Sequence, residues 1–376
     1  MRKTLYISNV AQKVGAFSMA SISASKANGM EMLIAANWSG TPVELREADG
    51  NKYGIKLVQI DLTRSPFSLR NVKALRQLVD FIKNESIDYI HCNTPVGGIL
   101  GRLAGRKCRV KKVIYQAHGF HFYKGAPLLN WILYYPVEKI LARITDEIIT
   151  INQDDYRLAK KKLHPRGQIH YVPGVGINTD DFAEDPQSRQ RIRSEIGASE
   201  DDFLVLSVGR LEQNKNVETV IKALSFIENK KIKLVVCGDG ELRESLQALA
   251  AEKGISDRVF FLGNRSDMKD IYYAVDCFTL ASYREGLSRS IMEAMACGLP
   301  CVVSKIRGNT DLVDVQGGML CAPSDCQAYS SAFETLYNDK DLRLSMAEHN
   351  HEKIILFGYD KVVEKMTGIY RKMVSE

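Results

Sequence analysis

Two glutamates and two cations in the second half of the chain could bind a phosphorylated sugar. Glu285 and Glu293 are eight residues apart, a little over two helical turns, so their carboxylates would point the same way. A carboxylate can accept hydrogen bonds from neighbouring sugar hydroxyls. Arg210 and Lys215 follow Gly209 after an apolar run and could hold both phosphates of a diphosphate without a metal ion. The spacing of these four residues is equally compatible with ordinary charged side chains on the protein surface.

Between the two glutamates the sequence predicts the start of a helix, which would add an anion site. The N–H groups of Gly286, Leu287 and Ser288 would lack partners within that helix and would face the ligand. The sugar would then lie at Glu285, the diphosphate at the helix start and a ribose at Glu293.

Two other nucleotide-binding signatures are missing from the sequence. In the segment CGDGEL, which begins at Cys237, Arg243 takes the place of the third glycine of G-x-G-x-x-G. The sequence also has no G-x-x-x-x-G-K-[ST] segment. NAD-type and P-loop binding are therefore disfavoured.

Short apolar runs alternate with helical patterns along both halves of the chain, and they must position these residues. This alternation predicts an α/β fold with parallel sheets. We expect two Rossmann-like domains facing each other across a cleft, with ligands at the carboxyl ends of the strands. The expected strands are Leu5–Ser8, Met32–Ala35, Lys56–Ile60, Tyr89–Cys92, Val113–Gln116, Glu147–Ile151, Ile169–Val172, Phe203–Val208, Lys233–Cys237, Val259–Leu262, Cys277–Leu280, Cys301–Val303 and Met319–Cys321.

Length and composition are those of an ordinary globular protein. The 376 residues are 45% hydrophobic and 26% charged, which excludes disordered, collagenous and disulfide-scaffold chains. The eight cysteines are scattered without a C-x-x-C pair, so we expect reduced thiols and no metal site. The sequence has no apolar run near the ~18–20 residues of a spanning helix and no signal-peptide core. We therefore expect a cytoplasmic location.

Charge is divided unevenly, and a strongly apolar segment lies between two basic clusters. Residues 1–178 carry 26 Lys and Arg against 13 Asp and Glu, a net charge of +13, whereas residues 179–376 have a net charge of −7.

Segment 127–142 is typical of an interfacial helix flanked by positive charge. The alternative for the basic clusters is a solvated face, and the alternative for the apolar segment is a core helix interrupted by Pro136. An anionic membrane surface is favoured over nucleic acid, which would need aromatic residues spaced among the basic ones. The predicted membrane and acceptor face comprises Arg102, Arg106, Lys107, Trp131, Tyr134, Tyr135, Lys160 and Lys161.

The motifs around the two glutamates resemble those of a known enzyme family. Glu285-x7-Glu293, followed by AMACGLPCVVS, together with Gly209-Arg210 and Lys215, is similar to the retaining glycosyltransferases of family 4, which have the GT-B fold. The resemblance spans nearly the whole chain. The stretches REGLSRSIMEAM, IRGNTDLV and QAHGFHFY resemble transferases that build capsule, exopolysaccharide or other lipid-linked glycans.

The resemblance implies which ligand each domain binds and what the residues that match the family motifs do. Residues 1–175, with the last helix (358–376) crossing back onto them, would bind the acceptor, and residues 176–357 the nucleotide sugar. Two departures from the family pattern are Asn216, in place of the usual glycine, and Gly15, single where two glycines are frequent. The catalytic residues would be His118, Arg210, Lys215 and Glu285; the donor-binding residues would be Gly15, Gly209, Asn264, Arg265, Gly286, Leu287, Ser288 and Glu293.

The resemblance also implies the reaction. A hexose or N-acetylhexosamine would pass with retention from a nucleotide-diphosphate sugar, a UDP-sugar by expectation, to a glycan acceptor linked to polyprenyl diphosphate. It would need no metal or other cofactor, and the chain would associate peripherally with the inner face of the cell membrane. A catalytically silent nucleotide-sugar-binding scaffold, and a hydrolase or epimerase of the nucleotide sugar, are the alternatives.

Overall fold

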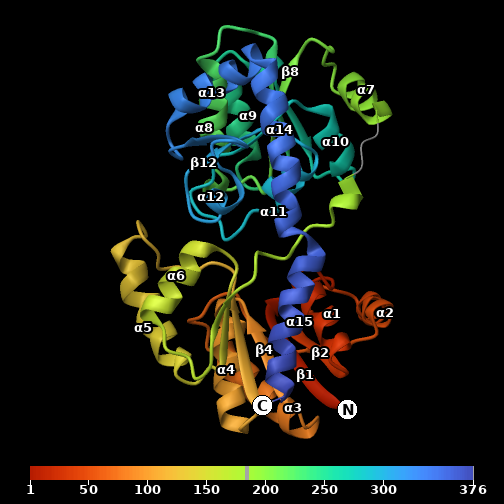
Figure 1. Cartoon of the computed structure of the whole chain (residues 1–376), viewed down its shortest axis with the longest axis vertical. Coiled ribbons are helices and arrows are strands. Elements are labelled where there is room, and N and C mark those ends of the chain that lie inside the picture. Colours follow the sequence, from red (N-terminus) through yellow and green to blue (C-terminus); the bar gives the residue numbers. More distant parts are fainter. Residues whose placement is uncertain (183–185, 376) are drawn as a thin grey trace. The chain divides into compact units, whose positions relative to one another are not determined.

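The computed structural model describes residues 1–182 and 186–375, which form two compact units (Figure 1). The N-terminal unit contains residues 1–176 and 359–375, and the C-terminal unit contains the described residues between 177 and 358. Each unit is built on its own parallel sheet. The two Rossmann-like domains predicted from the sequence are confirmed, and each expected strand is found to within a few residues.

The sheet of the N-terminal unit has the order β3-β2-β1-β4-β5-β6-β7. Its strands are β1 (Arg2–Val10), β2 (Met30–Asn37), β3 (Lys56–Gln59), β4 (Tyr89–Asn93), β5 (Lys112–Ala117), β6 (Glu147–Thr150) and β7 (Ile169–Tyr171). Leu5 of β1 pairs with Leu33 of β2 and with Ile90 of β4, and all three side chains are buried. The strand order reverses between β1 and β4, which is where such sheets place ligand sites.

The helices of the N-terminal unit contribute to two separate hydrophobic cores, one on each face of its sheet. One core contains side chains of α3 (Arg70–Asn84), α4 (Pro95–Cys108), α5 (Leu128–Ala142) and α6 (Gln153–Lys162). The other contains side chains of α1 (Ala16–Ala27), α2 (Val43–Tyr53) and α15 (Tyr359–Ser375). Figure 1 shows α15 beside α1, on the other side of the sheet from α5 and α6.

The C-terminal helix is anchored to the N-terminal unit by polar as well as apolar contacts. The Tyr370 hydroxyl lies 2.8 Å from Nδ1 of His91, which is fully buried on β4. Val362, Met366 and Ile369 of α15 are buried in the same core. The expectation that the last helix returns to the N-terminal domain is therefore confirmed.

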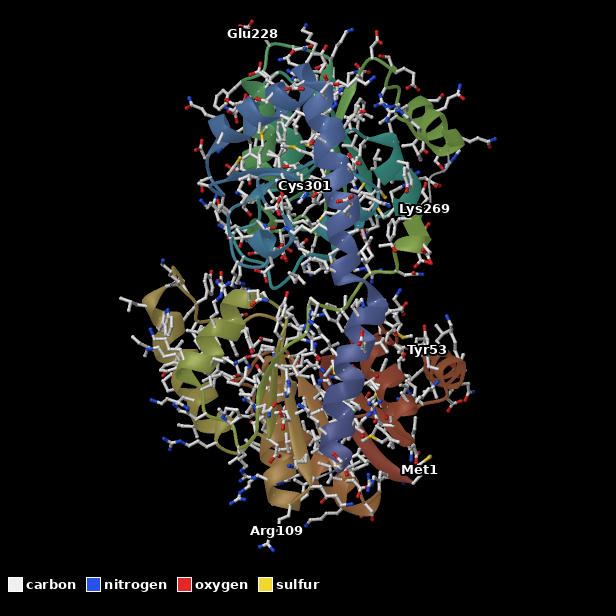
Figure 2. The ribbon with its side chains drawn as sticks, viewed as in Figure 1. Met1, Tyr53, Arg109, Glu228, Lys269 and Cys301 are labelled. Carbon is white, nitrogen blue, oxygen red and sulfur yellow. The ribbon has the colours of Figure 1, made fainter. Side chains whose placement is uncertain are left out.

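The sheet of the C-terminal unit has the order β10-β9-β8-β11-β12-β13. Its strands are β8 (Phe203–Val208), β9 (Ile232–Cys237), β10 (Val259–Gly263), β11 (Cys277–Leu280), β12 (Cys301–Ser304) and β13 (Gly318–Cys321). Its helices are α7 (Pro186–Glu195), α8 (Val217–Ser225), α9 (Arg243–Glu252), α10 (Met268–Ala274), α11 (Arg289–Ala296), α12 (Asn309–Leu312), α13 (Cys326–Asn338) and α14 (Lys340–Ile354). The eight cysteines are free thiols. Figure 2 shows Cys301 inside this unit, whereas Glu228 points outward.

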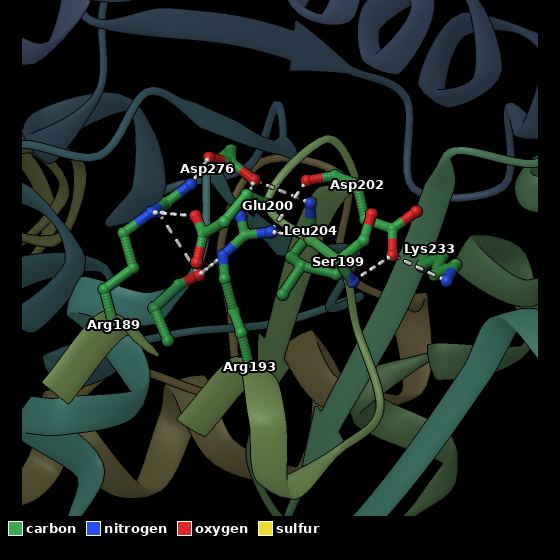
Figure 3. Close-up of polar contacts among 9 residues, drawn as sticks. Arg189, Arg193, Ser199, Glu200, Asp202, Leu204, Lys233 and Asp276 are labelled. Atoms are coloured by element: carbon green, nitrogen blue, oxygen red, sulfur yellow. Dashed lines mark hydrogen bonds and ion pairs between the residues drawn. The ribbon is translucent and has the colours of Figure 1, made fainter. Parts of the chain in front are cut away.

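A buried arginine network fixes α7 to the amino ends of the strands in the C-terminal unit (Figure 3). Nη2 of Arg193 lies 2.7 Å from Oδ2 of Asp276, and Arg189 reaches the same carboxylate at 2.9 Å. The Arg193 side chain is 1% exposed. Nearby, Asp202 pairs with Lys233 at 2.7 Å. These charges lie at the sheet edge opposite the carboxyl ends, so they serve the fold and not a ligand site.

Candidate active site

Lys215 and Glu285 meet at the carboxyl edge of the sheet in the C-terminal unit. Lys215 follows β8, and Glu285 follows β11, the two strands between which the strand order reverses. Nζ of Lys215 lies 2.7 Å from Oε1 of Glu285, with the two side chains 21% and 13% exposed. The structure thus brings together two of the predicted residues, and it does so where an open α/β sheet binds ligands.

The loop that carries Lys215 is fixed by its backbone and by Asn216. Asn216 has φ 54° and ψ 41°, a left-handed conformation that asparagine tolerates better than most side chains. Its amide donates to the carbonyl oxygens of Ala281 at 3.1 Å and Pro323 at 2.8 Å. Asparagine at the family's glycine position therefore keeps the required backbone conformation and also ties the loop to the strand end that leads to Glu285.

Close backbone packing brings the neighbouring loops together. Gly238 has φ +136°, and a Cβ added there would lie 1.9 Å from the carbonyl oxygen of Gly209, so only glycine fits. A Cβ on Gly308 would lie 2.2 Å from the carbonyl oxygen of Gly286. The loop after β12 thus lies directly against the turn that begins α11.

The predicted helix start is present, and Ser288 caps it. The Ser288 hydroxyl accepts a hydrogen bond from the backbone N–H of Ile291 at 3.5 Å. Gly286 and Leu287 precede this cap, directly after Glu285. The partial positive charge of the helix start and the carboxylate therefore lie in one turn, as the sequence predicts.

Glu293 lies within α11 and is held by two side chains that sequence reasoning did not single out. Tyr272 donates its hydroxyl to Oε2 at 3.0 Å, and Nε of Arg289 donates to Oε1 at 2.9 Å. The Glu293 side chain is 17% exposed. Arg289 could have been found from its i, i+4 spacing, whereas Tyr272 lies on a different helix and gives no local signal.

The other predicted donor residues of this unit are more loosely placed. Arg210 is 60% exposed, and Nη2 of its guanidinium lies 3.3 Å from Oε2 of Glu241, which is also exposed. Asn264 is exposed after β10. Arg265 next to it is committed to Asp267, at 2.7 Å, and to Glu195 of α7.

In the N-terminal unit, Gly15 and His118 lie at the carboxyl edge of the sheet. Gly15 precedes α1, and His118 follows β5. The Phe17 ring meets the His118 ring edge-on, with centroids 4.9 Å apart. Both ring nitrogens of His118 are buried, and neither has a hydrogen-bond partner among the residues that the structure describes. Burial lowers the pKa of His118 to about 4, so the ring is neutral at neutral pH.

Thr94, beside the strand reversal of the same sheet, was not foreseen. It has φ 64° and ψ 157°, a backbone conformation that a β-branched residue rarely adopts. Its hydroxyl lies 2.7 Å from Oδ1 of Asn9, which also accepts from the backbone N–H of Gly97 at 2.6 Å. Such strain is concentrated at functional sites, and no sequence pattern signals it here.

The predicted position of Arg102 in the membrane face is wrong. Arg102 is fully buried, and its guanidinium pairs with Glu138 of α5 at 2.7 Å and lies 3.8 Å from the centre of the Tyr115 ring. An arginine can take such a position only because a carboxylate compensates its charge. Arg106 and Lys107 on the same helix are exposed, as predicted, and so are Lys160 and Lys161 of α6.

The aromatic residues of α5 also turn inward. Trp131 and Tyr135 pack on Phe122, with ring centroids 5.5 and 5.4 Å apart, and Tyr134 stacks on His121. All three are partly buried. The apolar side chains that α5 exposes are instead Leu128, Leu129, Ile132, Leu133, Val137 and Ile140, which we call the α5 apolar face.

Within residues 1–182 and 186–375, no His, Cys, Asp and Glu side chains group as a metal site would require. No helix in this part of the chain has the length and apolarity needed to cross a bilayer.

Comparisons with known proteins agree with this architecture. The family model "Glycosyl transferase 4-like" matches residues 21–152, and "Glycosyl transferases group 1" matches residues 188–353. The crystal structure of Anabaena Alr3699/HepE in complex with UDP is similar with a TM-score of 0.81, at 20% identity and with 100% of both chains covered.

Curated relatives match along most of the chain. "Putative glycosyltransferase EpsD" of Bacillus subtilis (strain 168) is 36% identical over 375 residues, which cover 98% of this chain and 96% of the relative. "UDP-Gal:alpha-D-GlcNAc-diphosphoundecaprenol alpha-1,3-galactosyltransferase" of Escherichia coli is 31% identical, covering 83% of this chain and 82% of the relative. With these matches and with Lys215 and Glu285 paired at a strand reversal, the chain belongs to the family 4 glycosyltransferases of GT-B fold.

Proposed function

We propose that this glycosyltransferase moves a hexose or N-acetylhexosamine, with retention, from a UDP-sugar to a glycan linked to polyprenyl diphosphate, in the synthesis of a surface polysaccharide. The observation that carries the proposal is the Lys215–Glu285 pair, 2.7 Å apart at the strand reversal. The pair offers a cation for a diphosphate and a carboxylate for sugar hydroxyls. A named relative that uses UDP-galactose and a diphosphoundecaprenol acceptor, and a structural neighbour bound to UDP, support this choice of substrates.

The chemistry that these residues support is the stabilisation of a leaving diphosphate. The bond from the anomeric carbon to the diphosphate oxygen breaks, and its electron pair stays on that oxygen. The acceptor hydroxyl forms the new bond on the same face of the sugar and gives its proton to the departing diphosphate. Lys215, Arg210 and the start of α11 neutralise the developing charge, which is the largest contribution of this kind of site. We propose no metal ion for this role.

The remaining predicted residues take supporting roles in the proposal. Glu285 holds hydroxyls of the transferred sugar, and Glu293, oriented by Tyr272 and Arg289, holds the ribose. His118 offers two buried ring nitrogens without partners among the described residues, so it can hydrogen-bond to the sugar in the neutral form. Asn264 and Arg265 frame the base.

A membrane-embedded acceptor is the reason for proposing peripheral membrane binding. Ile132 and Ile140, two side chains of the α5 apolar face, are 67% and 65% exposed, and Lys139 and Arg143 lie beside them in sequence. Exposed apolar side chains flanked by cations are typical of helices that lie in the interface of an anionic membrane.

Product analysis tests the transfer. The chain is incubated with UDP-glucose, UDP-galactose or their N-acetyl forms, with a short prenyl-diphosphate-linked sugar and with EDTA, and the product anomer is read by NMR. We expect UDP release that depends on the acceptor, with an α-linked product, and a Lys215→Ala variant about 100- to 1,000-fold slower. Release of free sugar without acceptor would instead indicate a hydrolase.

Flotation with phosphatidylglycerol vesicles tests the membrane proposal. An Ile132→Ser/Ile140→Ser variant should float less than the native chain. The matched control is Leu45→Ser/Val72→Ser, which removes two apolar side chains that are 63% and 54% exposed on other helices of the same unit. Equal flotation of both variants would contradict the role of α5.

A further inference from the structure

A groove runs along the open edge of the sheet in the N-terminal unit. Strand β7 is the edge strand of this sheet. The groove beside it is lined by residues of α6 and of α15, helices whose side chains belong to the cores on opposite faces of the sheet. The groove has a volume of about 940 Å³, and its apolar lining includes Leu163, Ile169 and Val172. None of the residues predicted from motifs at the strand ends lines it, although Lys160 from the predicted membrane face does.

The groove is positively charged and lined by aromatic rings. Lys160, Lys365 and Lys372 line it, and its lining contains no carboxylate. None of the three lysines forms an ion pair with a carboxylate among the residues that the structure describes. Nζ of Lys160 lies 4.9 Å from the centre of the Tyr156 ring, and Nζ of Lys365 lies 5.1 Å from that of Tyr171. Three ammonium groups without counter-ions favour an anionic ligand.

The register of the sheet relates this groove to His118. Tyr171 of β7 pairs with Thr150 of β6, and Thr150 pairs with Ala117 of β5, the residue before His118. Two strand spacings separate β7 from β5, or about 10 Å. A phosphate beside Tyr171 and a sugar beside His118 could therefore belong to one molecule.

We propose that the lysine groove over β7 binds the diphosphate of the acceptor, so that the acceptor sugar reaches the strand ends near His118. This inference rests on the proposed function, because it takes the acceptor to be a prenyl-diphosphate-linked sugar. The prenyl chain would leave towards α5, which covers the same face of the sheet as α6 and carries the α5 apolar face. Lysines that only protect an exposed strand edge from pairing are the alternative.

Two matched variants of α15 separate these interpretations. Lys365→Ala/Lys372→Ala removes two groove lysines, and Lys361→Ala/Arg371→Ala removes two exposed cations of the same helix that do not line the groove. Binding of inorganic pyrophosphate and of geranyl diphosphate to the full chain is measured by calorimetry with saturating UDP, which fills the donor site. Vesicles of phosphatidylglycerol form a third arm.

We expect both diphosphates to bind the native chain and the control with similar Kd, and the groove variant roughly 10-fold more weakly, because it lacks two charge-assisted contacts. Equal affinity of the two variants, or no pyrophosphate binding by the native chain, would overturn the proposal. So would loss of vesicle binding alone, which would assign the lysines to lipid head groups. UDP binding is measured separately for each variant, so failure of the donor site is distinguished from failure of the groove.

Discussion

Replacing Glu285 by glutamine should strengthen the binding of UDP while it weakens transfer. In the structure the Glu285 carboxylate is the partner of the Lys215 ammonium, at 2.7 Å, and both side chains are largely buried. In the proposed donor site, a diphosphate would compete with this carboxylate for the same ammonium group. Glu285→Gln keeps the shape of the side chain and removes the competing charge.

The size of the effect follows from these contacts. Two like charges about 6 Å apart repel by about 3 kcal/mol at an effective dielectric constant of about 20. Part of this gain is lost, because the amide holds Lys215 in place less firmly than the carboxylate does. We expect a net gain of about 1 kcal/mol, or a roughly fivefold lower Kd for UDP. Calorimetry with EDTA present measures this, and kcat with a UDP-sugar should fall by at least 100-fold.

The matched control is Glu218→Gln, which breaks the Glu218–Lys222 pair on the exposed surface of α8. This variant should leave both UDP binding and kcat unchanged. Lys215→Ala should weaken UDP binding but leave uridine binding nearly unchanged. If Glu285→Gln weakened UDP binding as much as Lys215→Ala does, the two residues would act only as a structural pair, and the reasoning would be refuted.

Two further predictions concern stability. Arg102→Ala leaves the Glu138 carboxylate buried without its cation and should lower the free energy of unfolding by about 3–5 kcal/mol. Arg106→Ala on the exposed side of α4 should change it by less than about 0.5 kcal/mol, and urea unfolding that shows equal effects would contradict the buried pair. Burial lowers the pKa of His91 to about 3 and of His118 to about 4, from a usual value of 6.5. As the pH falls, the unfolded chain therefore protonates these histidines before the folded chain does. The free energy of unfolding should then fall between pH 6.5 and 5 by up to about 1.4 kcal/mol per pH unit for each histidine. Unfolding curves should show about half this slope for His118→Gln, and an unchanged slope would argue against a buried neutral ring.

The sequence was sufficient to predict the strands because they are buried on both faces. Runs such as Phe203–Val208 and Cys277–Leu280 are continuously apolar, and the structure places both strands at those residues. Glycine and polar residues follow each run, so the candidate ligand residues could be assigned to strand ends before the structure was known. Parallel topology then brings Lys215 and Glu285 to the same edge of the sheet, whereas the ion pair between them is seen only in the structure.

The sequence could not predict which face of a helix is buried when both of its faces are apolar. In α5, residues at positions 131, 134, 135 and 138 form the inward stripe, and this stripe includes Glu138, which compensates Arg102. Composition alone placed the aromatic rings and Arg102 on the surface. The lysine groove was also invisible, because Lys160 and Lys365 lie far apart in sequence and meet only when α15 returns to the N-terminal unit.

Calorimetric titration of the native chain with UDP, GDP, ADP and NAD, each in the presence of EDTA, tests the donor site most directly. We expect metal-free binding of UDP that is tighter than that of the other three nucleotides and is lost in Lys215→Ala. Binding of none of the four, or UDP binding that is unaffected by Lys215→Ala, would contradict it.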